Sequence, residues 1–462
     1  MTNLKFPRLS VAGGVIGIVL VIFGIVWMTA IFERFEKVPT DLDRTVDLEG
    51  TYTLVDPFVA ELQGNATVMG LAASGGAEAL LGDPAIAGLL TNPALGTLMA
   101  SPDVLGLLGD PAAMAALGNP ALLSLLSDPA AMGALSDPAA MMAMAAADPA
   151  IGALLADPAV IGLLTNPAVA TLTSQPELMA LLPALGPVLA NPIVGALLAD
   201  PAALGLIMDS RTQQILANPA NLPLTDPIPV VLHRTRVATG SDGDTLTINE
   251  KFTTTNTATG QDMGELDPRF APTSKTLIVD RSTKVFLPGT DDGRTGQWGM
   301  PFHVDKNKVY PSWISAASRA LDARYLRTEK LKGLETYVFE VRESDLPMGV
   351  DDPAGTGLPL VFDTLTNIWV EPLTGAGLHA TLTDTVSAMD PAGNKYTRFS
   401  QTLAYSDASV TRLVKTGKDD HDRLVMFGTW LPWGAIIVGA VLLVAMAVGI
   451  WMASRSRGEA TA

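Results

Sequence analysis

Two long apolar runs lie near the two ends of the chain. The first covers residues 9–32 without a charged side chain, and the second covers residues 424–454 with only Thr429 and Ser454 as hydroxyl residues. A transmembrane helix needs roughly 20 consecutive apolar residues, so each run is long enough to cross a bilayer. We expect two transmembrane helices. A cleaved signal peptide is the alternative for the first run, although its apolar stretch exceeds the usual length of roughly 7–15 residues.

Basic residues flank the outer ends of both runs and indicate the orientation of the chain. They are Lys5, Arg8, Arg455 and Arg457. Short segments rich in Lys and Arg tend to stay on the cytoplasmic side of a membrane. The sequence therefore predicts a two-pass plasma-membrane protein, with residues 1–8 and 455–462 in the cytoplasm and the bulk of the chain extracytoplasmic.

Between these runs, proline recurs every nine residues, with slips after Pro138 and Pro176. The regularly placed prolines are Pro84, Pro93, Pro102, Pro111, Pro120, Pro129, Pro138, Pro149, Pro158, Pro167, Pro176, Pro192, Pro201 and Pro219, and Ser210 stands where one is missing. Most follow Asp or Asn, which are preferred helix N-caps, and proline suits the first helical position. The next proline ends each helix, and helices that short need neighbours. We expect residues 83–222 to form an array of short stacked helices.

The predicted array is apolar on all sides. No Lys or Arg occurs between Thr45 and Ser210. Helices of this kind are normally buried or face an apolar partner. The short Asp/Asn-Pro helices resemble the client-binding helical repeats of co-chaperones. Three interpretations stay open: an array that buries its own apolar faces and acts as a spacer, a groove for a lipid or apolar peptide, and self-association into a homo-oligomer.

Alternating apolar and polar positions predict a β domain on both sides of this array. Residues 33–82 contain a linker and a first strand at 44–55, and residues 223–417 contain the rest. The expected strands cover residues 230–239, 245–256, 275–279, 284–287, 358–362, 367–371, 377–386 and 395–405, with a hairpin at 324–342 that turns at Lys332-Gly333. Short strands at even spacing are typical of an antiparallel curved sheet or open barrel. The array would then be an insertion in the β domain.

These patterns together predict an α+β membrane protein. It would have two terminal transmembrane helices, an exported antiparallel β domain and an inserted array of short helices. The net charge of −17 argues against a nucleic-acid partner. The chain contains no cysteine, which excludes disulfides and thiolate metal sites.

The sequence offers little catalytic or metal-binding chemistry. Its four histidines are scattered, and no nucleophile, phosphate-binding or dinucleotide motif is present. The pairs Asp242/Asp244 and Asp291/Asp292 are cation candidates, but turn chemistry explains Asp-Gly clusters equally well. We therefore expect no catalytic residue, no cofactor and no metal, and a protein that is not an enzyme.

Two segments carry a family resemblance. Residues 331–340 (LKGLETYVFE) and 368–375 (IWVEPLTG) resemble a paired signature of the porin PorA-like family of two-span membrane proteins, and residues 279–283 and 431–448 fit its turn and second anchor. The resemblance implies two anchors and an exported β domain, and the family name implies a pore. The inserted array departs from it. The same two segments are more loosely similar to LolA-type lipoprotein carriers, which implies a curved sheet around a lipid.

The strand pattern supplies a candidate ligand face. Tyr337, Phe339 and Val341 share one side of a strand, and Ile368 and Val370 share a side of another. We expect a membrane-anchored envelope protein whose β domain and apolar array bind or shelter a lipid or another hydrophobic ligand. The alternatives are an oligomeric channel, because two spans alone cannot enclose a pore, and a structural or adhesive envelope protein.

Overall fold

The computed structural model describes residues 6–32, 36–73, 122, 125, 131, 137–164 and 200–459. The chain forms two compact units, one made of Met1–Leu54 with Leu224–Ala462 and the other of Val55–Pro223. The first unit contains the β-sheet and the two terminal helices, and the second contains only helices among its described residues. The chain therefore leaves the sheet unit after its first strand and returns before its second.

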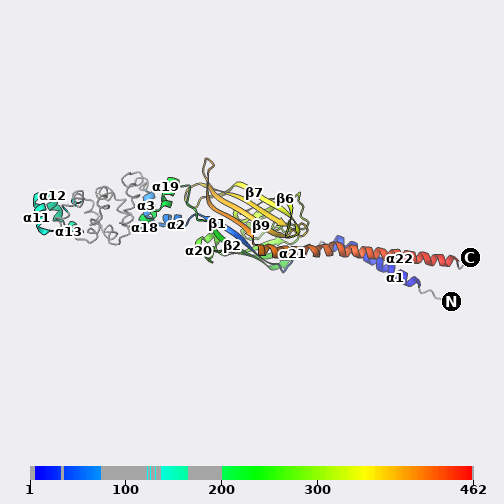
Figure 1. The fold of residues 1–462 in the computed structure, drawn as a ribbon. Coiled ribbons are helices and arrows are strands. Elements are labelled where there is room, and N and C mark those ends of the chain that lie inside the picture. Colours follow the sequence, from blue (N-terminus) through cyan, green and yellow to red (C-terminus); the bar gives the residue numbers. More distant parts are fainter. Residues whose placement is uncertain are drawn as a thin grey trace. The chain divides into compact units, whose positions relative to one another are not determined.

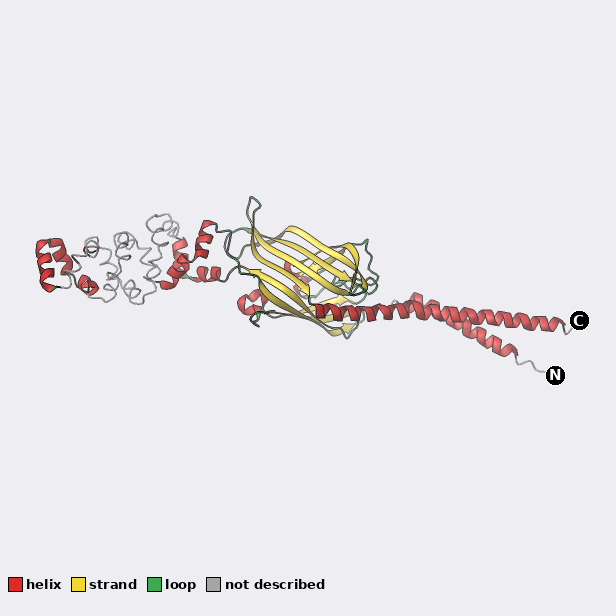
Figure 2. Cartoon of the chain, viewed as in Figure 1, coloured by secondary structure: helices red, strands yellow, loops and turns green. Residues whose placement is uncertain are grey.

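The first unit is built on one antiparallel sheet, which is twisted and curled (Figure 1, Figure 2). Its strand order is β4-β3-β2-β1-β10-β9-β8-β7-β6-β5. The strands are β1 (Asp43–Leu54), β2 (Ile228–Asp242), β3 (Thr245–Asn256), β4 (Thr273–Asp280), β5 (Tyr310–Ile314), β6 (Arg319–Leu331), β7 (Leu334–Asp351), β8 (Pro359–Val370), β9 (Gly377–Met389) and β10 (Lys395–Tyr405). The curled antiparallel sheet agrees with the predicted fold class.

The earliest strand in the chain occupies the middle of the sheet. β1 pairs with β2 on one side and with β10, the last strand, on the other. Its inward residues Leu48, Tyr52 and Leu54 are buried in a cluster with Phe399 of β10. The strand expected at residues 44–55 therefore belongs to the same sheet as the later strands, and the second unit is inserted between β1 and β2.

The two edge strands, β4 and β5, are linked through the segment between them. Isolated bridges pair Val279 with Phe286, Val285 with Gln297, and Gln297 with Ser312 of β5. The Gln297 amide donates to the Pro311 carbonyl at 2.6 Å. Residues 284–287, expected as a strand, form only these bridges, because Lys284 has a positive φ of 57° that breaks extended geometry.

Other local predictions differ in length. β8 is a single strand where two were expected at 358–362 and 367–371, because residues 360–369 pair with β9 without interruption. The β6–β7 hairpin turns at Lys332 and Gly333, both with positive φ, as a two-residue turn requires. The short strand β5 and the small helices α20 (Met263–Leu266), η3 (Pro268–Phe270), η4 (Asp291–Gly293) and η5 (Ser315–Ala317) were not predicted.

The terminal helices are longer than the apolar runs. α1 (Phe6–Val26) continues into a π-helical turn, η1 (Trp27–Ile31), and α21 (Asp407–Val425) continues through a second π-helical turn, η6 (Met426–Trp430), into α22 (Leu431–Glu459). α21 was expected as the end of the β domain up to residue 417. It is amphipathic instead, and its Val410, Leu413 and Val414 pack in the core cluster of β1.

Two helices are long and apolar enough to cross a membrane, Ala12–Ile31 and the apolar part of Asp407–Met452. They pack closely through glycine. A Cβ on Gly17 would lie 2.7 Å from the Gly439 carbonyl, and a Cβ on Gly439 would lie 2.6 Å from the Gly17 carbonyl. Small residues at such a crossing let two backbones approach, as in many membrane helix pairs.

The second unit contains short helices. α2 (Phe58–Gly64) and α3 (Ala66–Ala73) precede the predicted array, whereas α11 (Pro138–Ala147), α12 (Pro149–Leu155), α13 (Pro158–Leu164), α18 (Pro201–Met208) and α19 (Ser210–Ala217) begin at positions of the nine-residue pattern. Asp137 caps α11 by accepting from the Ala139 amide at 2.9 Å, and Asp200 caps α18 from the Ala203 amide at 3.1 Å. Most of the predicted array at 83–222 lies outside the described residues, so the array stays a prediction.

Candidate ligand-binding cavity

A cavity of about 760 Å³ lies in the first unit. Its lining comes from β1, β2, β5, β8, β9 and β10, from residues 37–42, from the segment between β4 and β5, and from α21 with both π-helical turns. The segment is held in place by backbone bonds at 2.9 and 2.8 Å, in which His303 and Val304 donate to the carbonyls of Leu373 and Pro372. A volume of this size is typical of small-molecule and cofactor sites.

One part of the lining is apolar and aromatic. It includes Trp27, Phe32, Val46, Leu48, Trp298, Met300, Phe302, Trp313, Ile368, Val370, Leu382, Leu413, Leu424 and Phe427. Two of these, Trp27 and Phe427, belong to the π-helical turns that continue into the apolar terminal helices. The cavity therefore has apolar lining residues both in the sheet and at the start of the helices that could cross a membrane.

The other part of the lining is cationic. Lys37, Arg44, Arg234, Arg236, Arg281, Lys284 and Arg423 line the cavity, against the carboxylates of Asp41 and Asp420. The whole chain carries a net charge of −17, so this concentration of positive charge is local. Like charges repel more strongly in a space lined by apolar side chains than in water, because the effective dielectric constant there is lower.

Three of the arginines come from two neighbouring strands. In the β1–β2 register, Arg44 is directly opposite Arg236 and Val46 is directly opposite Arg234. Residues 44 and 46 of β1, and 234 and 236 of β2, alternate with positions on the other face. The sheet geometry thus places three guanidinium groups at neighbouring positions on the inner face of two adjacent strands.

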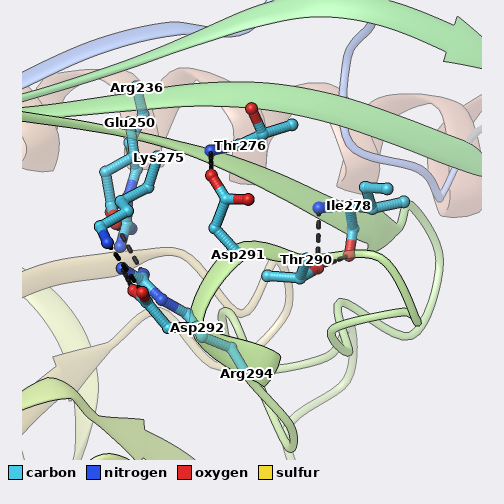
Figure 3. A network of polar contacts seen from close by, with 9 residues as sticks. All are labelled: Arg236, Glu250, Lys275, Thr276, Ile278, Thr290, Asp291, Asp292 and Arg294. Atoms are coloured by element: carbon cyan, nitrogen blue, oxygen red, sulfur yellow. Dashed lines mark hydrogen bonds and ion pairs between the residues drawn. The ribbon is translucent and has the colours of Figure 1, made fainter.

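A buried carboxylate neutralises part of this group. Glu250 on β3 is fully buried and accepts from Arg236 Nε at 2.6 Å and from Arg294 Nη1 at 2.7 Å (Figure 3). Burial alone would raise the pKa of Glu250, but the charges of Arg236, Arg234 and Arg294 lower it to about 2. Glu250 is therefore ionised and fixes Arg236 against the sheet.

The same network docks the loop before Arg294 on the edge strand (Figure 3). Lys275 of β4 pairs with Asp292 at 2.7 Å, and the Thr276 amide donates to Asp291 at 2.6 Å. The Thr290 hydroxyl accepts from the Ile278 amide at 2.9 Å. Side chains of the loop therefore occupy the hydrogen-bonding positions that a further strand would use.

Lys284 is the most deeply buried cation of the lining, with 6% of its surface exposed. Its ammonium donates to the Thr374 carbonyl and lies 4.1 Å from the centre of the Phe302 ring. Burial and the charge of Arg44 lower the pKa of Lys284 to about 7, although Glu371 and Asp420 act in the opposite direction. This lysine can therefore change its charge near neutral pH.

Two donors in the cavity lining lack an acceptor. Arg234 Nε and Trp298 Nε1 are buried and make no hydrogen bond within the described part of the chain. Buried polar atoms are nearly always hydrogen-bonded in folded proteins, so such exceptions need an explanation. An acceptor for either donor would have to come from outside the described residues.

The five residues of the predicted ligand face do come together. In the β7–β8 register, Phe339 is opposite Ile368, Tyr337 is opposite Val370, and Val341 is opposite Thr366. Ile368 and Val370 line the cavity. Phe339 and Val341 are fully buried in a cluster with residues of the 300–323 segment, and Tyr337 packs against it.

Three of the four carboxylates considered as cation ligands have other partners. Asp244 pairs with Lys37, and Asp291 and Asp292 belong to the network around β4. Three of the histidines contact carboxylates: His233 with Asp47, His303 with Glu36, and His421 with Glu371. In the described residues no group of three metal-ligating side chains occurs.

The cationic residues of the cavity were not singled out from the sequence. Arg234 and Arg236 follow Val230 and Leu232 at every second position, so two charges continue an otherwise apolar strand face. That departure from alternation is a signal that sequence reasoning could have used. Arg44 and Lys284 carry no comparable local signal, because their neighbours come from distant parts of the chain.

Known proteins place the chain in a family. Comparison with curated proteins gave no match. The sequence model of the family described as Porin PorA matches residues 180–448, which is more than half of the chain. That region covers β2 to β10, α21 and most of α22. The protein therefore belongs to the porin PorA family.

Proposed function

We propose that this protein is a membrane-anchored envelope protein that holds an amphiphilic lipid in the cavity of its β domain. The observation that carries the proposal is the cavity lining, which contains both apolar and aromatic side chains and cationic side chains. A lipid presents the two matching surfaces, an acyl chain and a polar headgroup. The lining also includes Phe427, which belongs to the π-helical turn that continues into a terminal helix. The looser LolA-like similarity of residues 331–340 and 368–375 is in keeping with this function.

Lipid analysis with a cavity-filling variant tests the proposal. Ala380 of β9 lines the cavity and is 7% exposed, whereas Thr383 lies on the same strand and is exposed. Full-length protein would be purified in detergent, and its bound lipids would be extracted and measured by mass spectrometry. Ala380→Phe should reduce the lipid per protein, because the ring occupies the cavity, and Thr383→Phe should not. Equal lipid in the wild type and both variants, with unchanged melting temperatures, contradicts the proposal.

Family membership favours a second function, an oligomeric channel. The family is described as a porin family, and the sheet of this chain is curled. A pore would need several copies of the chain, because two membrane spans cannot enclose one, and Ala12–Ile31 contains no charged residue to mark an ion path. Stepwise conductance from purified full-length protein in planar bilayers would favour the channel. Neither conductance nor bound lipid would leave a structural or adhesive envelope protein.

Both functions use the proposed topology, with cytoplasmic termini and residues 33–423 outside. The natural chain contains no cysteine, so single substitutions give clean probes. An impermeant thiol reagent applied to intact cells should label Ser241→Cys and leave Ser456→Cys unlabelled. The reverse pattern contradicts the orientation.

A further inference from the structure

The geometry points to a lipid with an anionic headgroup, held by Arg44 and Arg234 of the cavity lining. We infer this as a refinement that rests on the proposed lipid-binding function. The headgroup phosphate would lie against β1 and β2, and the acyl chains would contact the apolar side chains of the lining. The inference is independent of the overall charge of the protein, which is strongly negative.

The first step is the arginine pair at the centre of the sheet. Arg44 and Arg236 are directly opposite on β1 and β2. Like charges in such positions destabilise a sheet, and a strand pair with only a structural role avoids them. Burial and neighbouring Arg234 lower the pKa of Arg236, and burial lowers the pKa of Arg44. For these two arginines the shift reflects a positive charge in an unfavourable environment, whereas the pKa of Arg234 is raised despite its burial, through Tyr405 and Glu250.

The second step is the shortage of carboxylates. Glu250 is shared by Arg236 and Arg294, so it is already engaged on both oxygens. Arg44 and Arg234 form no ion pair within 4 Å in the described residues, and Asp420 acts on Arg44, and Glu250 on Arg234, from farther away. Two guanidinium groups therefore remain without a counter-ion in contact.

The third step is the unused hydrogen-bonding capacity. The Arg234 guanidinium is oriented by its bond to the Tyr405 hydroxyl at 2.7 Å, while its Nε is buried without an acceptor. Trp298 Nε1 is also buried without an acceptor, and the Arg236 guanidinium lies 5.4 Å from the Trp298 ring. A phosphate offers several acceptor oxygens and a negative charge, which is what the planar guanidinium fork binds best.

The test compares two soluble short-chain lipids that differ in headgroup charge. Full-length protein in a nonionic detergent would be titrated calorimetrically with dihexanoylphosphatidylglycerol, dihexanoylphosphatidylcholine and inorganic phosphate. The variant is Arg44→Gln combined with Arg234→Gln. The matched control is Arg342→Gln. It removes an exposed arginine of β7 that pairs with Glu340 of the same strand. Circular dichroism and melting temperature report whether each variant is folded.

We expect the anionic lipid to bind the wild type at least about tenfold more tightly than the zwitterionic lipid, the ratio that one charge-assisted contact provides. The double variant should lose this preference and keep the weaker affinity, and the control should keep both. Equal binding of the two lipids by the wild type overturns the anionic headgroup and leaves the lipid-binding function standing. Binding of neither lipid overturns the lipid-binding function itself.

The remaining arms separate a headgroup from a free anion. Inorganic phosphate that binds the wild type as tightly as the anionic lipid overturns the headgroup assignment, because the acyl chains then contribute nothing. If the double variant does not fold, the comparison of the three ligands on the wild type still decides the inference.

Discussion

The indole Nε1 of Trp27 donates a hydrogen bond of 2.8 Å to the backbone carbonyl of Phe427. The two residues lie in the π-helical turns of the two terminal helices. In a π-helical turn the carbonyl of residue 427 would accept from the amide of residue 432, but that residue is Pro432 and has no N–H. Trp27 therefore donates to the Phe427 carbonyl, which has no amide donor at position 432 of its helix.

Replacing Trp27 with Phe should destabilise this junction by about 0.5–1.5 kcal/mol, the usual net value of one hydrogen bond. The ring contact with Phe23, at 5.4 Å between centroids, is largely kept by the new aromatic ring. Hydrogen exchange of the amides around Phe427 should become faster in Trp27→Phe. Trp430→Phe is the control, because Trp430 lies in the same turn and is 73% exposed. Equal exchange in the two variants would show that the bond has no role.

The packed side of the candidate ligand face differs from its cavity side in expected stability. Phe339→Ala should lower the free energy of unfolding by about 3–5 kcal/mol, because Phe339 is fully buried and its ring packs edge-on against Tyr310 at 5.5 Å. Ile368→Ala, on the directly opposite residue, should lower it by less, since Ile368 already borders a cavity. Thermal unfolding of both variants checks this. A Phe339→Ala protein as stable as the wild type would place Phe339 at a cavity wall.

Much of this sheet could be predicted from the sequence because its strands alternate. The hairpin at Lys332-Gly333 is local, and its turn chemistry is visible in two residues. α21 was missed although its apolar positions are spaced for a helix. It continues directly into the apolar tail, which drew the boundary of the predicted helix to residue 424. β5 is five residues long and is defined by its partner β6 rather than by its own composition.

The cavity could not be predicted for a different reason. Arg44 and Arg236 belong to paired strands that are separated in sequence by the whole inserted unit. Lys284 reaches the site only because the segment between β4 and β5 folds back onto the turn at Thr374. Ile368 and Val370 of the predicted face line the cavity, and Arg44 and Arg236 are brought together in it by the β1–β2 register.

The carboxylate of Glu250 should be important for stability. Glu250→Gln removes a fully buried charge and leaves Arg236 and Arg294 without it, which should cost about 3–5 kcal/mol. Glu340→Gln removes one partner of an exposed pair with Arg342 and should cost at most about 1 kcal/mol. Urea unfolding at neutral pH compares the two. Similar losses in both variants would contradict a special role for the buried network.

Glu250 also predicts an acid dependence. Its folded pKa of about 2 lies below the ordinary value of 4.5, so its contribution is present above about pH 4.5 and is lost as the pH falls toward 2. The wild type should therefore lose more stability over that interval than Glu250→Gln does.

Lys284 predicts a dependence on alkaline pH. Its folded pKa of about 7 lies below the ordinary value of 10.5, so the unfolded chain binds more protons between these values. Stability should rise as the pH increases from about 7, by at most about 1.4 kcal/mol per pH unit. Lys284→Met should remove this rise, and Lys330→Met, at an exposed site, should retain it. Melting temperatures measured across this interval decide, and identical slopes in the two variants contradict the prediction.

The most direct test of a lipid in the cavity is photocrosslinking in a native membrane environment. Full-length protein in vesicles would be mixed with a phospholipid that carries a photoactivatable group on its acyl chain, and crosslinked peptides would be mapped by mass spectrometry. A lipid held in the cavity should label residues 297–302 and 366–382, which include lining residues Trp298 and Ile368, in addition to the terminal helices. Labelling in 297–302 and 366–382 should fall in Ala380→Phe and persist in Thr383→Phe. Crosslinks confined to residues 12–31 and 431–452 would contradict a lipid-binding β domain.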